Sequence, residues 1–165
     1  MNKFIWLICS IILLSACKKD SSKCEFTESN ASASTTERTT IENYLTANSI
    51  VAAAHPSGIY YTINTPGTGA IPSVCSVIRV KYSGYLFSGA LFDSYTSANG
   101  ISFVLGQLIG GWHKGLPLIK AGGNITLYIP PSLGYGQADR RDANNNVVIP
   151  GNSYLKFVIE LMDVQ

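Results

Sequence analysis

Alternation of apolar and polar residues along three stretches of the chain limits its fold more than any other feature of the sequence. In residues 78–83, 125–129 and 155–161, apolar side chains occupy every second position, which predicts strands with one buried and one solvated face. Glycine and proline mark the joints between such segments at 66–67, 110–111, 122–123 and 150–151. One short helical stretch, at about 111–120, lies among the strands. Several strands with a single helix and no β-α-β alternation predict an α+β domain with an antiparallel sheet.

Composition is consistent with one globular domain plus a short additional segment. The chain has 165 residues, of which 46% are hydrophobic and 13% are charged. Lys and Arg together number 12 and Asp and Glu number 10, and these charges are scattered along the chain. Because a nucleic-acid binder would carry a basic stripe, we expect no nucleic-acid partner.

The N-terminal residues 1–16 have the pattern of a secretory signal. A short basic start precedes an apolar run from Phe4 to Leu14, which is far below the roughly 20 residues needed to span a bilayer. The sequence Leu14-Ser15-Ala16-Cys17 that follows resembles the lipobox of bacterial lipoproteins. In that motif the Cys is acylated and becomes the first residue of the mature protein. An ordinary signal peptide with a chance Cys is the alternative.

The lipobox interpretation predicts a lipid-anchored protein of the cell envelope. Several acyl chains on Cys17 would give durable anchoring, whereas a single chain binds membranes only marginally. Lys18, in place of Asp, favours the outer membrane by analogy, with the protein facing either the periplasm or the cell surface. The membrane would be contacted through the lipid anchor only.

Two further cysteines, Cys24 and Cys75, remain after Cys9 leaves with the signal and Cys17 carries lipid. In an exported protein, two such thiols predict a disulfide, with two buried or idle thiols as the alternative. Their spacing matches no zinc pattern and the two histidines of the chain are isolated, so we expect no metal site.

Three segments are expected after the signal. Residues 17–39, rich in Ser and Thr, predict a lipidated Cys followed by a flexible tether. Residues 40–56 predict a short helical extension, because Thr39 and Glu42 have the spacing of a capping box and apolar residues follow at helical spacing. Residues 57–165 form the predicted main domain.

Six motifs between Val80 and Leu161 resemble those of the FKBP family of prolyl isomerases, and they occur in the same order as in that family. They are Val80–Leu86 with Gly89–Ser94, Phe103–Gly106 with Leu108–Leu116, Ile129–Pro131, Gly134–Gly136, Val148–Asn152 and Leu155–Leu161. The resemblance covers roughly residues 57–165. It implies a curved antiparallel sheet wrapped around a short helix, with an apolar pocket between them.

The resemblance also implies the residues of that pocket. Carried over position by position, they are Tyr82, Phe92, Asp93, Phe103, Leu108, Ile109, Trp112, Tyr135, Ile149 and Phe157. Trp112 would form the floor on which a proline ring sits. The Tyr135 hydroxyl and the backbone N–H of Ile109 would donate hydrogen bonds to carbonyls that flank the proline, and Asp93 would be a positioning residue bonded to the Tyr82 hydroxyl. Asp93, Tyr135 and Ile109 are therefore the implied catalytic residues.

The implied activity is peptidyl-prolyl cis-trans isomerisation, which needs no cofactor. Implied partners are proline-containing unfolded or exported proteins, and macrolide inhibitors such as FK506 or rapamycin. A non-catalytic client-binding chaperone and a structural lipoprotein remain as alternatives, because the aromatic residues taken alone are typical of an ordinary core. Two segments depart from the family pattern: residues 137–148 form a long polar loop, and residues 94–102 lack the basic residue that often accompanies Asp93.

Overall fold

The computed structural model describes residues 24–165. Its α-helices are α1 (Thr35–Ala47) and α2 (Gly110–Gly115). Its strands are β1 (Ala53–Ala54), β2 (Tyr60–Thr65), β3 (Val77–Leu86), β4 (Leu91–Tyr95), β5 (Ile101–Val104), β6 (Gly123–Ile129), β7 (Arg140–Arg141), β8 (Val147–Ile149) and β9 (Leu155–Val164).

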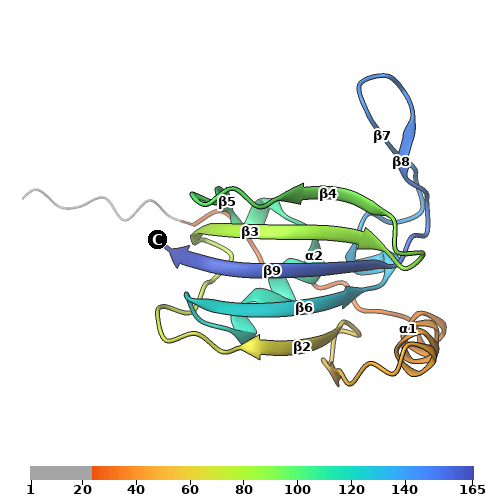
Figure 1. Cartoon of the computed structure of the whole chain (residues 1–165), viewed down its shortest axis with the longest axis horizontal. Helices are drawn as coiled ribbons and strands as arrows, with labels where there is room; N and C mark the ends of the chain where they lie inside the picture. Colours follow the sequence, from red (N-terminus) through yellow and green to blue (C-terminus); the bar gives the residue numbers. More distant parts are fainter. Residues whose placement is uncertain (1–23) are drawn as a thin grey trace, which may run out of the picture.

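Within residues 24–165, seven strands form one antiparallel sheet (Figure 1). The strand order is β1-β2-β6-β9-β3-β4, and β5 also pairs with β3. β7 and β8 form a separate two-stranded hairpin that projects beyond the sheet. The predicted α+β class, with a curved antiparallel sheet and a short helix against it, is confirmed.

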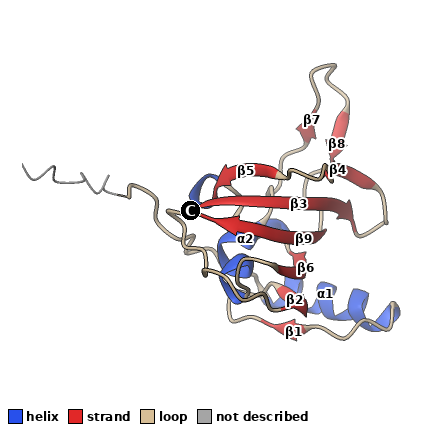
Figure 2. Ribbon diagram, turned by 60° about the vertical axis from the view of Figure 1, so that its left-hand side comes forward, coloured by secondary structure: helices blue, strands red, loops and turns tan. Residues whose placement is uncertain are grey.

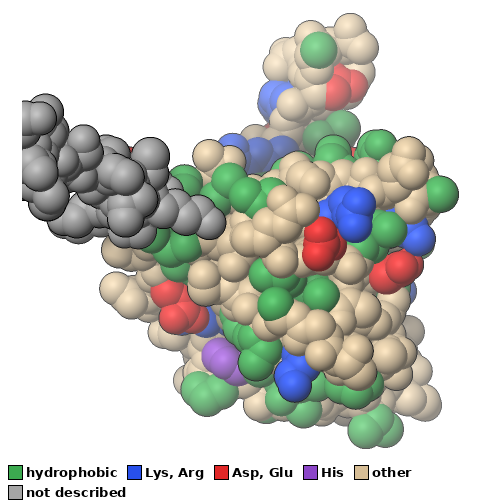
Figure 3. All heavy atoms as spheres, turned by 90° about the vertical axis from the view of Figure 1, so that its left-hand side faces the viewer, with side chains coloured by type: hydrophobic (Ala, Val, Ile, Leu, Met, Phe, Trp, Pro, Cys, Tyr) green, Lys and Arg blue, Asp and Glu red, His purple; other side chains and the backbone are tan. Residues whose placement is uncertain are grey.

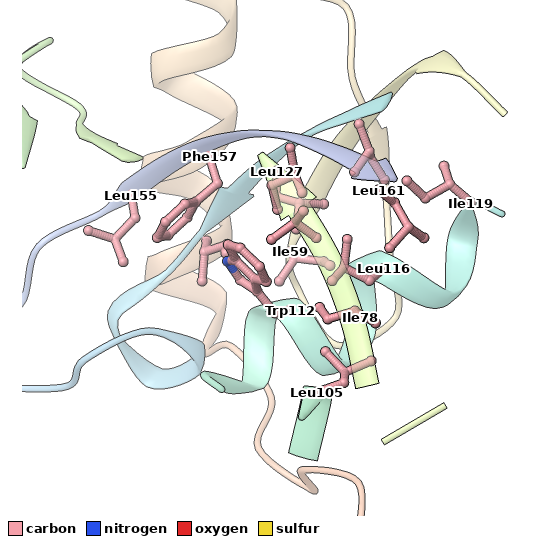
Figure 4. Packing of buried hydrophobic residues seen from close by; sticks show 14 of the residues in the cluster. Ile59, Ile78, Leu105, Trp112, Leu116, Ile119, Leu127, Leu155, Phe157 and Leu161 are labelled. Atoms are coloured by element: carbon pink, nitrogen blue, oxygen red, sulfur yellow. The ribbon is translucent and has the colours of Figure 1, made fainter. Parts of the chain in front are cut away.

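The main core lies between α2 and one face of the sheet (Figure 2). The alternating apolar side chains of β6 and β9 are buried there: Ile125, Leu127, Ile129, Leu155, Phe157, Ile159 and Leu161. Trp112 and Leu116 point from the helical segment towards Leu127 and Phe157 (Figure 4). A Cβ on Gly115 would lie 2.5 Å from the Leu127 side chain, so a glycine lets α2 approach the sheet this closely.

The helical segment is shorter than predicted. The expected helix covered about 111–120, whereas α2 ends at Gly115 and a 3₁₀ turn occupies Leu116–Leu118. Pro117 lies within that turn and has no N–H to donate, so it cannot continue the α-helical hydrogen-bond pattern.

The predicted start of the N-terminal helix is wrong. The Ser34 side chain caps α1 by accepting from the Glu37 N–H, and the Glu37 carboxylate accepts in return from the Ser34 N–H at 2.8 Å. Two capping-box spacings lie near this helix, and the predicted one, Thr39 with Glu42, lies inside the helix. Glu42 instead accepts a hydrogen bond from the Tyr60 hydroxyl. The earlier box prevails because it adds a helical turn and satisfies the first free N–H groups of that turn.

A second, mainly aromatic cluster attaches α1 to the domain. It contains Ile41, Leu45, Tyr60 and Tyr128, with Tyr44, Phe87 and Tyr154 packed against it. The rings of Tyr44 and Phe87 stack with centroids 3.8 Å apart. The chain then returns through β1 to pair with β2, so the predicted extension 40–56 supplies the end of a helix and an edge strand.

Residues 24–34, which we call the N-terminal strap, lie against the domain and so contradict the prediction of a flexible tether for that part of 17–39. A disulfide joins Cys24 to Cys75, with Cα atoms 5.7 Å apart. The Lys114 ammonium donates to the Glu28 carboxylate at 2.8 Å, and the Ala33 N–H donates to the Ser57 carbonyl at 2.8 Å. The predicted disulfide is confirmed. The polar attachments leave no apolar pattern in the segment, so the sequence showed no sign of them.

The predicted signal residues 1–16 and the lipidation site Cys17 lie outside the described residues. Between residues 24 and 165, neither helix has the length and apolar character needed to cross a bilayer.

Candidate active site

A cavity of about 210 Å³ opens between the sheet and the N-terminal end of α2. It is lined by Tyr82, Asp93, Phe103, Gln107, Leu108, Ile109, Trp112, Tyr135 and Phe157. Eight of these nine residues are among those implied by the family resemblance. β3, β4, β5, β9, the segment before α2, α2 itself and the loop after β6 all contribute, so residues far apart in the sequence meet at one site.

Three residues depart from the predicted set. Phe92 stands behind the wall, with its ring perpendicular to those of Phe157 and Tyr135. Ile149 is buried in the main core and does not line the cavity. Gln107 lines the cavity but was missed, because a lone polar residue between Gly106 and Leu108 carries no chemical signal of its own.

A β-bulge in β4 directs Phe92 and Asp93 towards the cavity. In the pairing of β3 with β4, Gly84 is opposite Asp93 and Tyr85 is opposite Leu91, so Phe92 is the extra residue. A Cβ on Gly84 would come within 2.7 Å of the Phe92 ring and 2.8 Å of the Phe157 ring. The glycine therefore makes room for the two rings that back the cavity.

Trp112 forms the floor of the cavity. It follows Ile109 and two glycines at the start of α2, and only 4% of it is exposed. Its ring is nearly perpendicular to that of Phe157, with centroids 5.3 Å apart, and to that of Tyr82, with centroids 5.6 Å apart. Edge-to-face contacts of this kind are favourable beyond the buried area and hold the indole in one orientation.

The hydroxyl of Tyr82 donates a hydrogen bond of 2.7 Å to the Asp93 carboxylate, as the sequence predicted. Burial, followed by this hydrogen bond, raises the pKa of Tyr82 well above its ordinary value. The tyrosine therefore keeps its proton at neutral pH and continues to donate it to Asp93. The pair links β3 to β4 at the wall of the cavity and holds the carboxylate in place.

Two hydrogen-bond donors face the cavity without an internal partner. Within residues 24–165, neither the Tyr135 hydroxyl nor the Ile109 N–H donates to another residue. Burial and the nearby Asp93 carboxylate raise the pKa of Tyr135, against an opposing effect of Arg140, so this hydroxyl also stays protonated. Ile109 has extended backbone angles as the N-cap of α2, and such N–H groups at the start of a helix are free to bind a ligand.

The site can therefore bind a compact apolar ring on Trp112 while two donors hold polar groups at its sides. In the part of the chain that the structure describes, no three His, Cys, Asp or Glu side chains gather to hold a metal ion.

Comparison with known proteins assigns this chain to a class. The family model for FKBP-type peptidyl-prolyl cis-trans isomerase matches residues 69–162. The chain belongs to this family.

Individual relatives agree with the assignment. The chain is 42% identical over 110 residues to the FKBP-type peptidyl-prolyl cis-trans isomerase FkpA of Escherichia coli K12, which covers 66% of this chain and 38% of the relative. It is 44% identical to FkpA of Buchnera aphidicola from Baizongia pistaciae, over 66% of this chain and 41% of the relative. The chain thus spans about two fifths of the length of these curated relatives.

Solved structures share the fold. The crystal structure of FkpA from Escherichia coli matches with a TM-score of 0.66 and 34% identity, over 79% of this chain and 60% of that one. A peptidyl-prolyl cis-trans isomerase from Pseudomonas syringae matches with a TM-score of 0.66 and 28% identity, over 82% of this chain and 98% of that one.

Proposed function

We propose that this protein catalyses cis-trans isomerisation of X-Pro peptide bonds in the 210 Å³ cavity. The observation that carries the proposal is an aromatic cavity floored by Trp112 with two unpartnered donors at its rim. Membership of the FKBP family and the peptidyl-prolyl cis-trans isomerase activity for which the FkpA relatives are named support the same function.

The proposed catalysis rests on the polarity of the amide. The partial double bond of X-Pro imposes a barrier of about 18–20 kcal/mol, and uncatalysed exchange takes tens to hundreds of seconds. The planar amide has negative charge on oxygen and positive charge on nitrogen, and twisting the bond removes this charge separation. An apolar aromatic cavity disfavours the planar amide more than the twisted one, and so binds the transition state more tightly.

The residues of the rim would orient the substrate. The Ile109 N–H and the Tyr135 hydroxyl would donate to carbonyls on either side of the proline and hold the twisted geometry. Asp93 would act through Tyr82 as a positioning residue, because its carboxylate accepts the Tyr82 hydrogen bond. No step needs a nucleophile or a proton transfer.

An X-Pro isomerisation assay on residues 24–165, made without lipid, tests the proposal. Folded protein should accelerate exchange of an X-Pro peptide over the buffer rate. Tyr135→Phe and Asp93→Ala should each lower kcat/KM by about 2- to 12-fold, the equivalent of one hydrogen bond worth about 0.5–1.5 kcal/mol. Folded wild-type protein with no rate above buffer would refute catalysis. Full activity in both variants would refute the residue assignment.

Macrolides provide a second test of the same cavity. FK506 or rapamycin should compete with the peptide, because the family resemblance implies that this pocket binds such macrolides. Calorimetry should detect binding to the wild-type domain and weaker binding to Trp112→Ala, provided that circular dichroism shows the variant to be folded. Failure of the wild-type domain to bind at high micromolar ligand would exclude a macrolide-competent pocket.

The proposed location is the cell envelope, with Cys17 as the lipid-bearing residue and exported proteins as clients. The lipobox-like residues 14–17 and the Cys24–Cys75 disulfide, which suits an oxidising compartment, support this location. Mass spectrometry of the protein from bacterial membranes should find an acylated Cys17, and Cys17→Ser should move the protein to the soluble fraction. An unmodified Cys17 in membrane-derived protein would refute lipid anchoring.

A client-holding chaperone is the second candidate. Val147 and Val148, on the projecting β7–β8 hairpin, are 42% and 39% exposed and offer apolar surface to a client. Suppression of client aggregation that persists when macrolide blocks catalysis would favour this function.

A further inference from the structure

One side chain of the β7–β8 hairpin reaches back to the cavity. The guanidinium carbon of Arg140 lies 5.4 Å from the centre of the Tyr135 ring, a cation–π distance. Tyr135 itself lines the cavity, so Arg140 lies directly beside a residue of the cavity wall. The opposing effect of Arg140 on the pKa of Tyr135 agrees with this position.

The position of Arg140 is fixed by the base of the hairpin. Arg140 pairs in the β-ladder with Ile149, whose side chain is 5% exposed and belongs to the main core. Asp139, the preceding residue, accepts a hydrogen bond of 3.0 Å from the Gly151 N–H. The hairpin projects from the body (Figure 3), but its base is attached, and Arg140 is part of that base.

Arg140 is also a cation without a counter-charge. Within residues 24–165 its guanidinium makes no ion pair or hydrogen bond, whereas that of the neighbouring Arg141 is bound by the Asp139 carboxylate at 2.9 Å and by the Asn145 carbonyl. The other carboxylate of the hairpin, Asp142, accepts from the Asn144 and Asn146 backbone N–H groups. The guanidinium therefore remains free to bind an anionic group that approaches the cavity.

We propose that Arg140 is a specificity-determining residue that favours clients with Asp or Glu next to the proline. The proposal rests on the isomerase function proposed above. A polypeptide with its proline on Trp112 and a flanking carbonyl on Tyr135 must pass the Tyr135 ring, and Arg140 covers that ring. A guanidinium recognises a carboxylate by two parallel hydrogen bonds as well as by charge, which suits an acidic side chain on the client.

Paired peptides that differ only in Glu or Gln, placed directly before or directly after the proline, measure this preference. The ratio of kcat/KM for the Glu peptide to that for the Gln peptide should be about two- to five-fold at low salt, as for an exposed ion pair. It should fall towards one in 1 M salt, where the screening length is only about 3 Å. Because each ratio is taken within one protein, a general loss of activity cancels.

The variants isolate the guanidinium. Arg140→Gln should bring the ratio to one, and Arg140→Lys should retain only part of it. Lys156→Gln is the matched control, because Lys156 also lies over a tyrosine ring, that of Tyr85 at 4.8 Å, but on the other face of the sheet. The control should keep the wild-type ratio.

Each result decides between the two proposals. If both peptides of every pair are turned over equally by wild-type protein, or if Arg140→Gln slows both equally and leaves the ratio unchanged, the specificity role is wrong and the isomerase function stands. If no peptide is turned over, the isomerase function fails, and calorimetric affinities of the same peptide pairs decide the role of Arg140 alone.

Discussion

Two segments outside the main sheet, the N-terminal strap and the β7–β8 hairpin, contact residues at or next to the same cavity but are attached in opposite ways. The strap is fixed to the body at several points along its length by the disulfide, the Glu28–Lys114 ion pair and backbone hydrogen bonds. The hairpin beyond its base is held mainly by contacts within itself, such as those around Asp142 (Figures 1 and 3).

The strap contacts residues that directly precede or follow cavity residues in the sequence. Phe26 packs on Gly106, one residue before the wall residue Gln107. The Ser29 N–H donates at 3.4 Å to Nδ1 of His113, next to the floor residue Trp112. Because of this difference, we expect substitutions in the strap to alter the free energy of unfolding, whereas substitutions in the hairpin should alter which clients are bound.

Loss of the disulfide gives the largest expected effect. Cys24 and Cys75 are 51 residues apart, and the chain-entropy estimate for a loop of that size is about 4 kcal/mol of unfolding free energy. Urea unfolding of the Cys24→Ser/Cys75→Ser variant should show a loss of up to that amount. Reductant should destabilise the wild-type protein and leave the variant unchanged. An unchanged midpoint in the double variant would mean that the strap does not depend on its covalent link.

Crowding between the strap and the loop before α2 gives the next effect. A Cβ on Gly106 would lie 2.5 Å from the Phe26 side chain, so Gly106→Ala should cost about 1–3 kcal/mol of stability. Adding Phe26→Gly should recover part of this loss, because glycine removes the Phe26 Cβ as well as the ring atoms that the new Cβ would meet. Equal and additive losses in the double variant would show that the two residues do not contact each other in solution.

Acidification provides a smaller, graded test of the strap. Burial lowers the pKa of His113 below its ordinary value of 6.5. The backbone of Leu105 and Leu108 and then the Glu28 carboxylate oppose this effect, and Lys114 adds to it. A histidine with a depressed folded-state pKa gives stability that is complete above pH 6.5 and is lost as the pH falls towards the folded-state value. One such group changes the unfolding free energy by at most about 1.4 kcal/mol per pH unit.

His113→Gln should flatten the fall in stability between pH 6.5 and 5. The residual slope belongs to His55, whose pKa burial also lowers. A slope equal to that of wild-type protein would assign the acid sensitivity elsewhere.

Shortening the hairpin should have the smallest effect on stability. Replacing residues 142–146 by Asn-Gly keeps β7, β8 and Arg140 and removes a tip that contacts little else, so unfolding free energy should change by about 0.5 kcal/mol or less. The ratio of turnover between acidic and neutral peptides should persist, because Arg140 lies at the base. A stability loss comparable to that of the disulfide variant would abolish the contrast between the two segments.

The sequence predicted the sheet well, because each face of a half-buried strand leaves a period of two in the chain. It also predicted eight residues of the cavity wall, through motifs whose order resembles a known family. It predicted the Cys24–Cys75 disulfide but treated the rest of the strap as a flexible tether, because a few polar contacts can fix a segment rich in Ser and Thr without an apolar pattern. The start of α1 was missed because two capping boxes five residues apart compete, and their contacts decide between them.

The residues that sequence reasoning misplaced depend on contacts between distant segments. Ile149 belongs to a motif of the family, but its side chain turns into the core at the base of the hairpin. Arg140 had no distinguishing signal in a run of polar residues, and only the folded chain brings it onto Tyr135.

The disulfide also determines how the domain would withstand tension. A pull on the chain at Cys24 passes through the covalent bond to Cys75, two residues before β3. β3 lies inside the sheet between β9 and β4, so the force would load its whole ladder with β9 in shear. The strap, α1 and β1 lie off that route and bear no load. With the bond reduced, the same pull would peel the strap from the body one contact at a time. The disulfide therefore makes the central ladder of the sheet the mechanical attachment point of the domain.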